Sequence, residues 1–212
     1  DSAAIARAIR YAARAGTDVI NLSLEFPAYV RAQEIPEVLS ALRFARRHGS
    51  VVVAAAGNKA GTAVAYPARA EQVMAVGATT ITGCEADYSN AGKDLDVVAP
   101  GGGLDAPNTR SQWDIDHCRP GVPGRAIIQQ TFTHDGWVQS FGLRGPLYEG
   151  TSMAAPHVAA VAALVIATGR LGPNPSPRMV EDHIKATARD AGNPGFDPFY
   201  GYGIVDAAAA LR

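Results

Sequence analysis

The chain has 212 residues, of which 47% are hydrophobic and 18% are charged, and its formal net charge is −1. This composition is typical of a globular protein and excludes a disordered or fibrous chain. The near-neutral charge offers no electrostatic basis for binding nucleic acid or an anionic membrane, and no apolar run reaches the roughly 18 residues needed to span a bilayer.

The first predicted elements alternate between helix and strand. Apolar residues at helical spacing predict a helix over 2–15, and the short β-branched run at 18–24 predicts a strand. A second helical pattern begins near Pro36 and ends at His48. The continuous apolar run at 50–58 is typical of a strand that is buried on both faces.

Two more short strands are predicted at 73–78 and 94–100. The alternation of strands and helices implies an α/β fold, with a parallel sheet covered by helices. One domain over 1–212 is the simplest organisation. It contains a loop insertion at about 102–145, where Gly, Pro, Asp and Asn are frequent.

Beyond the insertion, we predict helices near 152–168 and 177–188, and a short last helix with Asp206 as its N-cap. The first of these has no polar face, which indicates a core helix. It begins within the stretch GTSMAAPHVAA. One interpretation is that Thr151 or Ser152 caps the helix; the other is that Ser152 is a nucleophile at the positive end of the helix dipole.

The chain resembles the subtilisin-like serine proteases (subtilases) in six blocks that occur in the family's order: DVINLSL, VVVAAAGN, YPARAEQVMAVGA, DLDVVAPG, GTSMAAPHVAA and YGYGIVDAAAAL. The resemblance runs from about residue 2 to the end of the chain and is interrupted by the insertion. It implies the three-layer, doubly wound, mainly parallel α/β sheet of that family. It also implies a serine endopeptidase.

The resemblance implies roles for individual residues. Ser152 is expected to attack a peptide carbonyl and form an acyl-enzyme. The backbone N–H of Ser152 and the side-chain amide of Asn58 are expected to stabilise the oxyanion. The residues expected to flank an extended substrate are Ser23, Leu24, Glu25, Ala56 and Gly57.

Glu25 departs from the family pattern, which usually has glycine after the sequence SL. Either the acid shifts substrate preference toward basic side chains, or it partly obstructs the cleft. We favour the first alternative.

The family also carries an aspartate in a D-[ST]-G motif and a histidine in an H-G-T-H motif, both before the serine. This sequence contains neither motif. None of its five histidines has a motif that would identify it as the general base (His48, His117, His134, His157, His183). The chain also starts without an initiator methionine. We therefore expect a catalytic domain truncated at its N-terminus, inactive or nearly so when alone.

Two function hypotheses follow. The first is a serine endopeptidase, secreted or in the cell envelope, whose partners are a peptide or protein substrate and the missing N-terminal segment of the same protein. The alternative is a non-catalytic subtilisin-like module used for binding or assembly. A lipase or esterase of the α/β-hydrolase class is excluded, because it would need G-x-S-x-G and Ser152 lies in G-T-S-M-A.

No cofactor is expected to be required. Asp94 and Asp96 are candidate ligands of a structural calcium, although two solvated acids at a strand start is the interpretation we prefer. Cys84 and Cys118 lack the CxxC spacing of a zinc site. They either form one disulfide or remain two buried thiols, and the loop-rich surroundings of Cys118 favour the disulfide.

Overall fold

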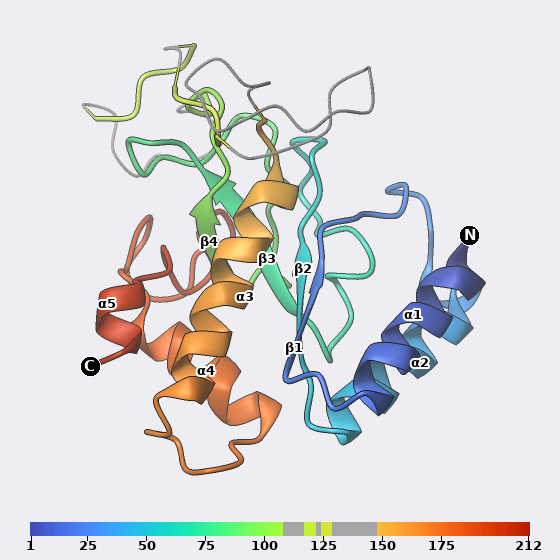
Figure 1. Ribbon diagram of the computed structural model, residues 1–212. Helices are drawn as coiled ribbons and strands as arrows, with labels where there is room; N and C mark the ends of the chain where they lie inside the picture. Colours follow the sequence, from blue (N-terminus) through green and yellow to red (C-terminus); the bar gives the residue numbers. More distant parts are fainter. Residues whose placement is uncertain (108–116, 122–123, 129–147) are drawn as a thin grey trace.

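The computed structural model describes residues 1–107, 117–121, 124–128 and 148–212 (Figure 1). Parallel strands form a single sheet in the order β1-β2-β3-β4, which is also their order along the chain. Their bounds are Val19–Leu22 for β1, Val51–Ala55 for β2, Met74–Thr79 for β3 and Val97–Pro100 for β4. The predicted parallel α/β sheet is thereby confirmed. Much of the predicted insertion lies outside the described residues.

Helices cover both faces of the sheet (Figure 1). On one face lie α1 (Ser2–Arg14) and α2 (Pro36–Arg47), and on the other lie α3 (Thr151–Ala167) and α4 (Pro177–Thr187). A short 3-10 helix (Ala32–Glu34) precedes α2, and α5 (Ala207–Ala210) ends the chain. As predicted, the side chain of Asp206 caps α5, accepting a 2.8 Å hydrogen bond from the N–H of Ala209.

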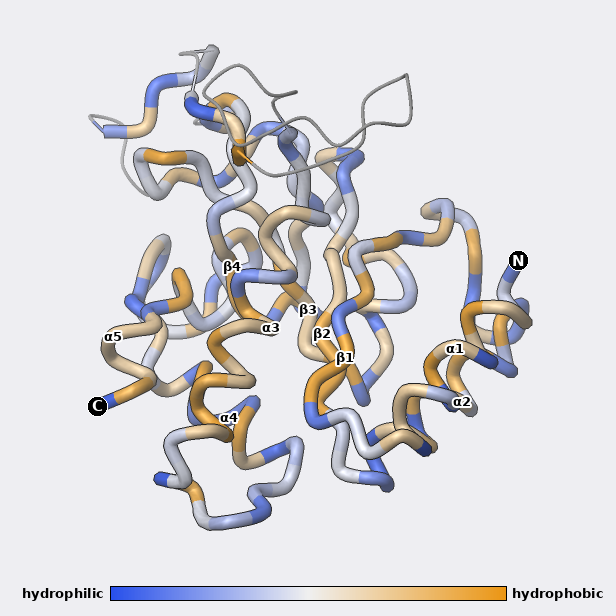
Figure 2. The backbone as a smooth tube through the Cα atoms, viewed as in Figure 1, coloured by the Kyte–Doolittle hydropathy of each residue, from blue (hydrophilic) through white to orange (hydrophobic). Residues whose placement is uncertain are grey.

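Burial of both faces of β2 explains why its sequence is continuously apolar. Alternate residues of a strand point to opposite faces. Val52 and Ala54 pack with α1 and α2, whereas Val51, Val53 and Ala55 pack with α3 and α4. All five are buried, and apolar residues dominate this strand (Figure 2).

Helix α3 is only partly the core helix that its sequence predicts. One side is buried against all four strands. The opposite side is exposed, and its members are Pro156, His157, Ala160, Ala163, Leu164 and Ala167. We call this set the outer face of α3. Nothing in the described part of the chain covers it, and β1 at the edge of the sheet pairs there only with β2.

This outer face gives a prediction about the isolated chain. An unpaired strand edge beside apolar side chains favours association between copies. We expect the 212-residue chain to self-associate, as measured by light scattering over a concentration series. Leu164→Glu should weaken the association. Met179→Glu is the matched control, because Leu164 and Met179 have nearly equal exposure, 48% and 47%. A monodisperse wild-type monomer at every concentration would contradict the prediction.

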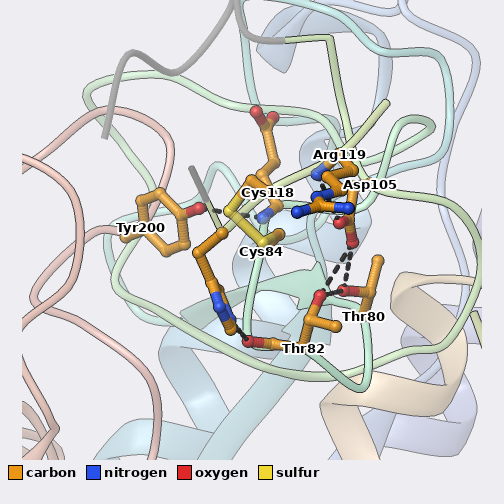
Figure 3. Close-up of a disulfide and its surroundings, with 9 residues drawn as sticks. Thr80, Thr82, Cys84, Asp105, Cys118, Arg119 and Tyr200 are labelled. Carbon is orange, nitrogen blue, oxygen red and sulfur yellow. Dashed lines mark hydrogen bonds between the residues drawn. A yellow bond between two sulfur atoms is a disulfide. The ribbon is translucent and has the colours of Figure 1, made fainter. Parts of the chain in front are cut away.

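The two cysteines form a disulfide, as the loop-rich surroundings favoured (Figure 3). It joins the loop after β3 to the described part of the insertion, across a sequence separation of 34 residues. Asp105 reinforces the same junction. Its carboxylate accepts hydrogen bonds from the hydroxyls of Thr80 (2.6 Å) and Thr82 (2.9 Å) and from the N–H of Arg119 (3.0 Å).

Removing this disulfide should lower stability measurably. Closing a loop of this length removes entropy from the unfolded chain, which corresponds to about 2–4 kcal/mol in the free energy of unfolding. We expect the Cys84→Ser/Cys118→Ser variant to lose that amount in urea denaturation. Adding a reductant should bring the wild type to the same value and leave the variant unchanged. Equal stability of the oxidised wild type and the variant would refute the expectation.

Candidate active site

The carboxyl ends of β1 and β2 meet the N-terminus of α3. Because the two strands are parallel neighbours, the residues that follow them lie at the same edge of the sheet. Ser23, just after β1, and Ser152, in the first turn of α3, are joined reciprocally. The hydroxyl of Ser23 donates to the carbonyl of Ser152 at 2.7 Å, and the hydroxyl of Ser152 donates to the carbonyl of Ser23 at 3.3 Å.

The N-cap residue of α3 contributes no side-chain hydrogen bond to the helix. Gly150 is the N-cap, with φ 148°, and Thr151 is already helical. The capping interpretation of Thr151 and Ser152 is therefore wrong. Both side chains hydrogen-bond to residues outside the helix instead: that of Thr151 contacts Asn58, and that of Ser152 contacts Ser23.

Asn58 is held with its amide in one orientation. Its Oδ1 atom accepts hydrogen bonds from the N–H of Thr151 (2.8 Å) and from the Thr151 hydroxyl (3.0 Å). With the oxygen occupied in this way, the Nδ2 group is the end of the amide that remains to donate. The N–H of Ser152 has no hydrogen-bond partner among the described residues, and dipoles aligned along α3 make this end of the helix positive. The N–H of Ser152 and the Asn58 amide, which is bound to Thr151, therefore both lie at the start of α3.

The turn before Asn58 is built around Gly57. Its φ of 110° is one that residues with a side chain rarely adopt, and a Cβ there would collide with the side-chain amide of Asn90. The Asn90 side chain occupies that space, and its Nδ2 donates a hydrogen bond to the carbonyl of Ala56 at 3.1 Å. The N–H of Gly57 donates to the Thr151 hydroxyl at 3.2 Å. The turn and the helix N-terminus therefore fix each other.

Tyr88 holds the other side of the helix start. Its hydroxyl oxygen lies 2.8 Å from the carbonyl oxygens of both Gly101 and Gly102 and accepts a 2.9 Å hydrogen bond from the N–H of Gly150. Burial raises the pKa of the Tyr88 phenol well above its usual range, so the hydroxyl stays protonated and able to donate. Tyr88 is thus a positioning residue for the segment that carries Ser152.

Sequence reasoning assigned no role in the site to Tyr88, Asn90 or Thr151. Only Thr151 left a signal, because it belongs to the GTS motif. The other two contribute through contacts with distant segments, which neither periodicity nor spacing reveals.

The predicted substrate-flanking residues lie along this edge of the sheet. Ser23, Leu24 and Glu25 follow β1, and Ala56 and Gly57 follow β2. Leu24 packs into the core on the α1 and α2 face. Glu25 points to Asn58. Its Oε2 atom accepts from the backbone N–H of Asn58 at 3.2 Å, and its Oε1 atom lies 3.5 Å from Asn58 Nδ2.

The side chains of the described histidines contact residues other than Ser152. His48 ends α2 and stacks on Phe44, and a ring nitrogen of His117 lies 2.7 Å from the carbonyl of Thr82. His157 and His183 lie similarly close to the backbone carbonyls of Met153 and Ala210. None of these four contacts Ser152, and His134 lies outside the described residues.

The candidate calcium ligands have protein partners. Asp94 lies 3.5 Å from the Nε atom of Arg69. Asp96 accepts from the N–H of Ala75 at 2.8 Å and lies 3.4 Å from Nζ of Lys185. Burial raises the pKa of the Asp96 carboxyl despite these partners. Asp96 is thus not the solvated acid that we preferred, whereas 34% of the Asp94 side chain is exposed. The described ranges contain no cluster of three potential ligands from His, Cys, Asp and Glu.

A protein-family model described as the subtilase family matches residues 1–203. M-protease of Shouchella clausii (strain KSM-K16) is 34% identical over 208 residues, which are 98% of this chain and 43% of that protein. Subtilisin BL of Lederbergia lenta is 33% identical over 208 residues, 98% of this chain and 61% of that protein. The chain therefore spans about half the length of these relatives.

Solved structures of proteases also match this chain. A protease from Pseudoalteromonas arctica PAMC 21717 matches with a TM-score of 0.68 and 34% identity, over 92% of this chain and 50% of that one. A lanthipeptide protease matches with a TM-score of 0.74 and 27% identity, over 100% of this chain and 66% of that one.

Proposed function

The chain belongs to the subtilase family of serine proteases, and from this premise we propose that it forms the serine-bearing part of an endopeptidase active site. The observation that carries the proposal is the anchoring of the Asn58 amide on Thr151, directly before Ser152. This contact supports the proposal, because acyl transfer requires a hydroxyl and N–H donors close to one another.

In the proposed reaction, the Ser152 oxygen attacks the carbonyl carbon of a peptide bond while its proton passes to a general base. Negative charge develops on the carbonyl oxygen, which accepts hydrogen bonds from the N–H of Ser152 and from Nδ2 of Asn58. The base then gives its proton to the leaving amine, and an acyl-enzyme remains on Ser152. Water hydrolyses this ester by the same route. No cofactor takes part.

We further propose that the base and its orienting carboxylate come from a segment of the same protein that precedes this chain. Two observations support this. The described histidines are engaged away from Ser152, and the outer face of α3 and the free edge of β1 present an apolar surface that such a segment would cover. In the family the order along the chain is Asp, His, Ser.

We also propose that the protein works outside the reducing cytoplasm, either secreted or in the cell envelope. The Cys84–Cys118 disulfide supports this, because such bonds persist in oxidising compartments. Within the described residues, no helix is long and apolar enough to cross a membrane.

The test is hydrolysis of an unfolded protein substrate, such as denatured casein. The chain extended by the preceding segment should cleave it, and the 212-residue chain alone should not. Hydrolysis by neither protein would reject the endopeptidase proposal.

A binding or assembly role is the second candidate. It is favoured by one observation, namely that the carboxylate of Glu25 lies on the donors of Asn58 where an oxyanion would have to bind. Under this alternative the extended chain would bind peptides without hydrolysing them.

A further inference from the structure

The Glu25 carboxylate is the one negatively charged group that contacts the Asn58 amide in the described part of the chain. Its two oxygens lie 3.2 Å from the backbone nitrogen and 3.5 Å from Nδ2 of Asn58. The same part of the chain offers Glu25 no cationic partner within ion-pair distance. Among the described residues, neutral N–H groups alone hold the carboxylate.

These hydrogen bonds are long. The usual N–H···O distance is about 2.9–3.0 Å. The bonds from Asn58 are charge-assisted on the acceptor side only, because the amide carries no charge. A guanidinium or ammonium group that reaches Glu25 would add the attraction of a full opposite charge, and a guanidinium could bind both carboxylate oxygens. This attraction favours exchange of the carboxylate from Asn58 to such a cation.

The position of Glu25 also matters for the proposed reaction. A carboxylate against Nδ2 of Asn58 competes with an oxyanion for that donor and repels its negative charge. Because Asn58 Oδ1 is fixed by Thr151, the amide cannot turn its Nδ2 group away from Glu25. The second Nδ2 hydrogen can still donate, but an oxyanion bound to it would lie beside the Glu25 carboxylate and be repelled by it. Acyl transfer is thus faster when Glu25 leaves.

We propose that Glu25 is a specificity-determining residue that links recognition of a basic side chain to release of the oxyanion donor. The inference rests on the proposed function. An Arg or Lys residue of the substrate next to the scissile bond pairs with Glu25, draws its carboxylate away and frees Asn58. A neutral residue leaves the carboxylate in place. The preference for basic substrates then resides in kcat as well as in KM.

The test compares two peptides that differ only in the residue before the scissile bond, arginine or its neutral isostere citrulline. It uses the extended protein that carries the preceding segment. Losing one oxyanion donor costs about 10²–10³ in kcat, a figure measured on a subtilisin, so the wild type should cleave the arginine peptide with a kcat about 100-fold higher. Glu25→Ala should raise kcat for the citrulline peptide by the same factor, about 100-fold, and so remove the difference between the peptides.

Glu25→Gln keeps the shape of the side chain and removes its charge, so it should act in the same direction. Glu71→Ala removes an exposed acid elsewhere and should leave both rates unchanged. If Glu25→Ala only raises KM for the arginine peptide, or slows both peptides equally, Glu25 does not gate the donor and the inference is overturned.

A second readout separates this failure from failure of the proposed function. A fluorophosphonate has no side chain for Glu25 to bind, and its phosphonyl oxygen needs the same donors. It should label Ser152 of the extended Glu25→Ala protein about 10-fold faster than that of the wild type. Labelling at equal rates overturns the inference and leaves the proposed function standing. No labelling of either protein overturns both.

Discussion

Replacing Ser152 by alanine is expected to lower kcat of the extended protein by about 10⁶-fold, the loss measured when the nucleophile of a subtilisin is removed. The reason is that the oxygen which forms the acyl-enzyme disappears while the donors around it remain. The measurement is kcat on a peptide substrate, together with urea denaturation of both proteins. Stability should change little, because within the described part of the chain the Ser152 hydroxyl donates only one hydrogen bond, 3.3 Å long, to the carbonyl of Ser23.

Ser40→Ala is a suitable control for this experiment. Ser40 lies on α2, across the sheet from α3, and accepts a hydrogen bond from Arg10. Removing the Ser40 hydroxyl should leave kcat at the wild-type value. A Ser152→Ala protein that keeps activity within about tenfold of the wild type would place the nucleophile on another residue.

Replacing Asn58 by alanine is expected to lower kcat by about 10²–10³ and to change KM little, since the donor acts on charge that develops only in the transition state; this range too was measured on a subtilisin. Asn58→Asp should be at least as damaging. It keeps an oxygen for Thr151, but it replaces the Nδ2 donor by a second acceptor and sets a negative charge against Glu25.

The kinetic constants of these two variants separate catalysis from binding. A rise in KM at unchanged kcat would mean that Asn58 holds the substrate uniformly and does not stabilise an oxyanion. Unfolding curves measured in parallel show whether the contact with Thr151 contributes to folding as well.

Much of the sheet could be predicted from sequence because its strands are unusually simple. The run at 51–55 has no polar residue, so only burial on both faces suits it, and the structure confirms this. Helix α3 shows the limit of the same argument. Apart from its first turn and His157, its sequence is apolar all round, yet Ala160, Ala163 and Leu164 are exposed. Periodicity reports which surfaces are apolar, but it does not report what covers them.

The site could be predicted only in part. Ser152 and Asn58 are recognisable by resemblance, but the contact between Thr151 and Asn58 joins residues 93 positions apart. The capping interpretation was wrong for the same reason: local preference favours Thr or Ser as an N-cap, whereas the distant partner Asn58 takes the Thr151 hydroxyl. The departure at Glu25 was visible in the sequence, but its contact with Asn58 required the structure.

The most direct test of the central claim, that Ser152 is a nucleophile lacking its base in this chain, is fluorophosphonate labelling followed by mass-spectrometric mapping of the adduct. The extended protein should carry the adduct on Ser152, Ser152→Ala should abolish it, and the 212-residue chain alone should remain unlabelled. An adduct on another residue would contradict the assignment of the nucleophile. Labelling of the isolated chain at the rate of the extended protein would show that the base lies within residues 1–212.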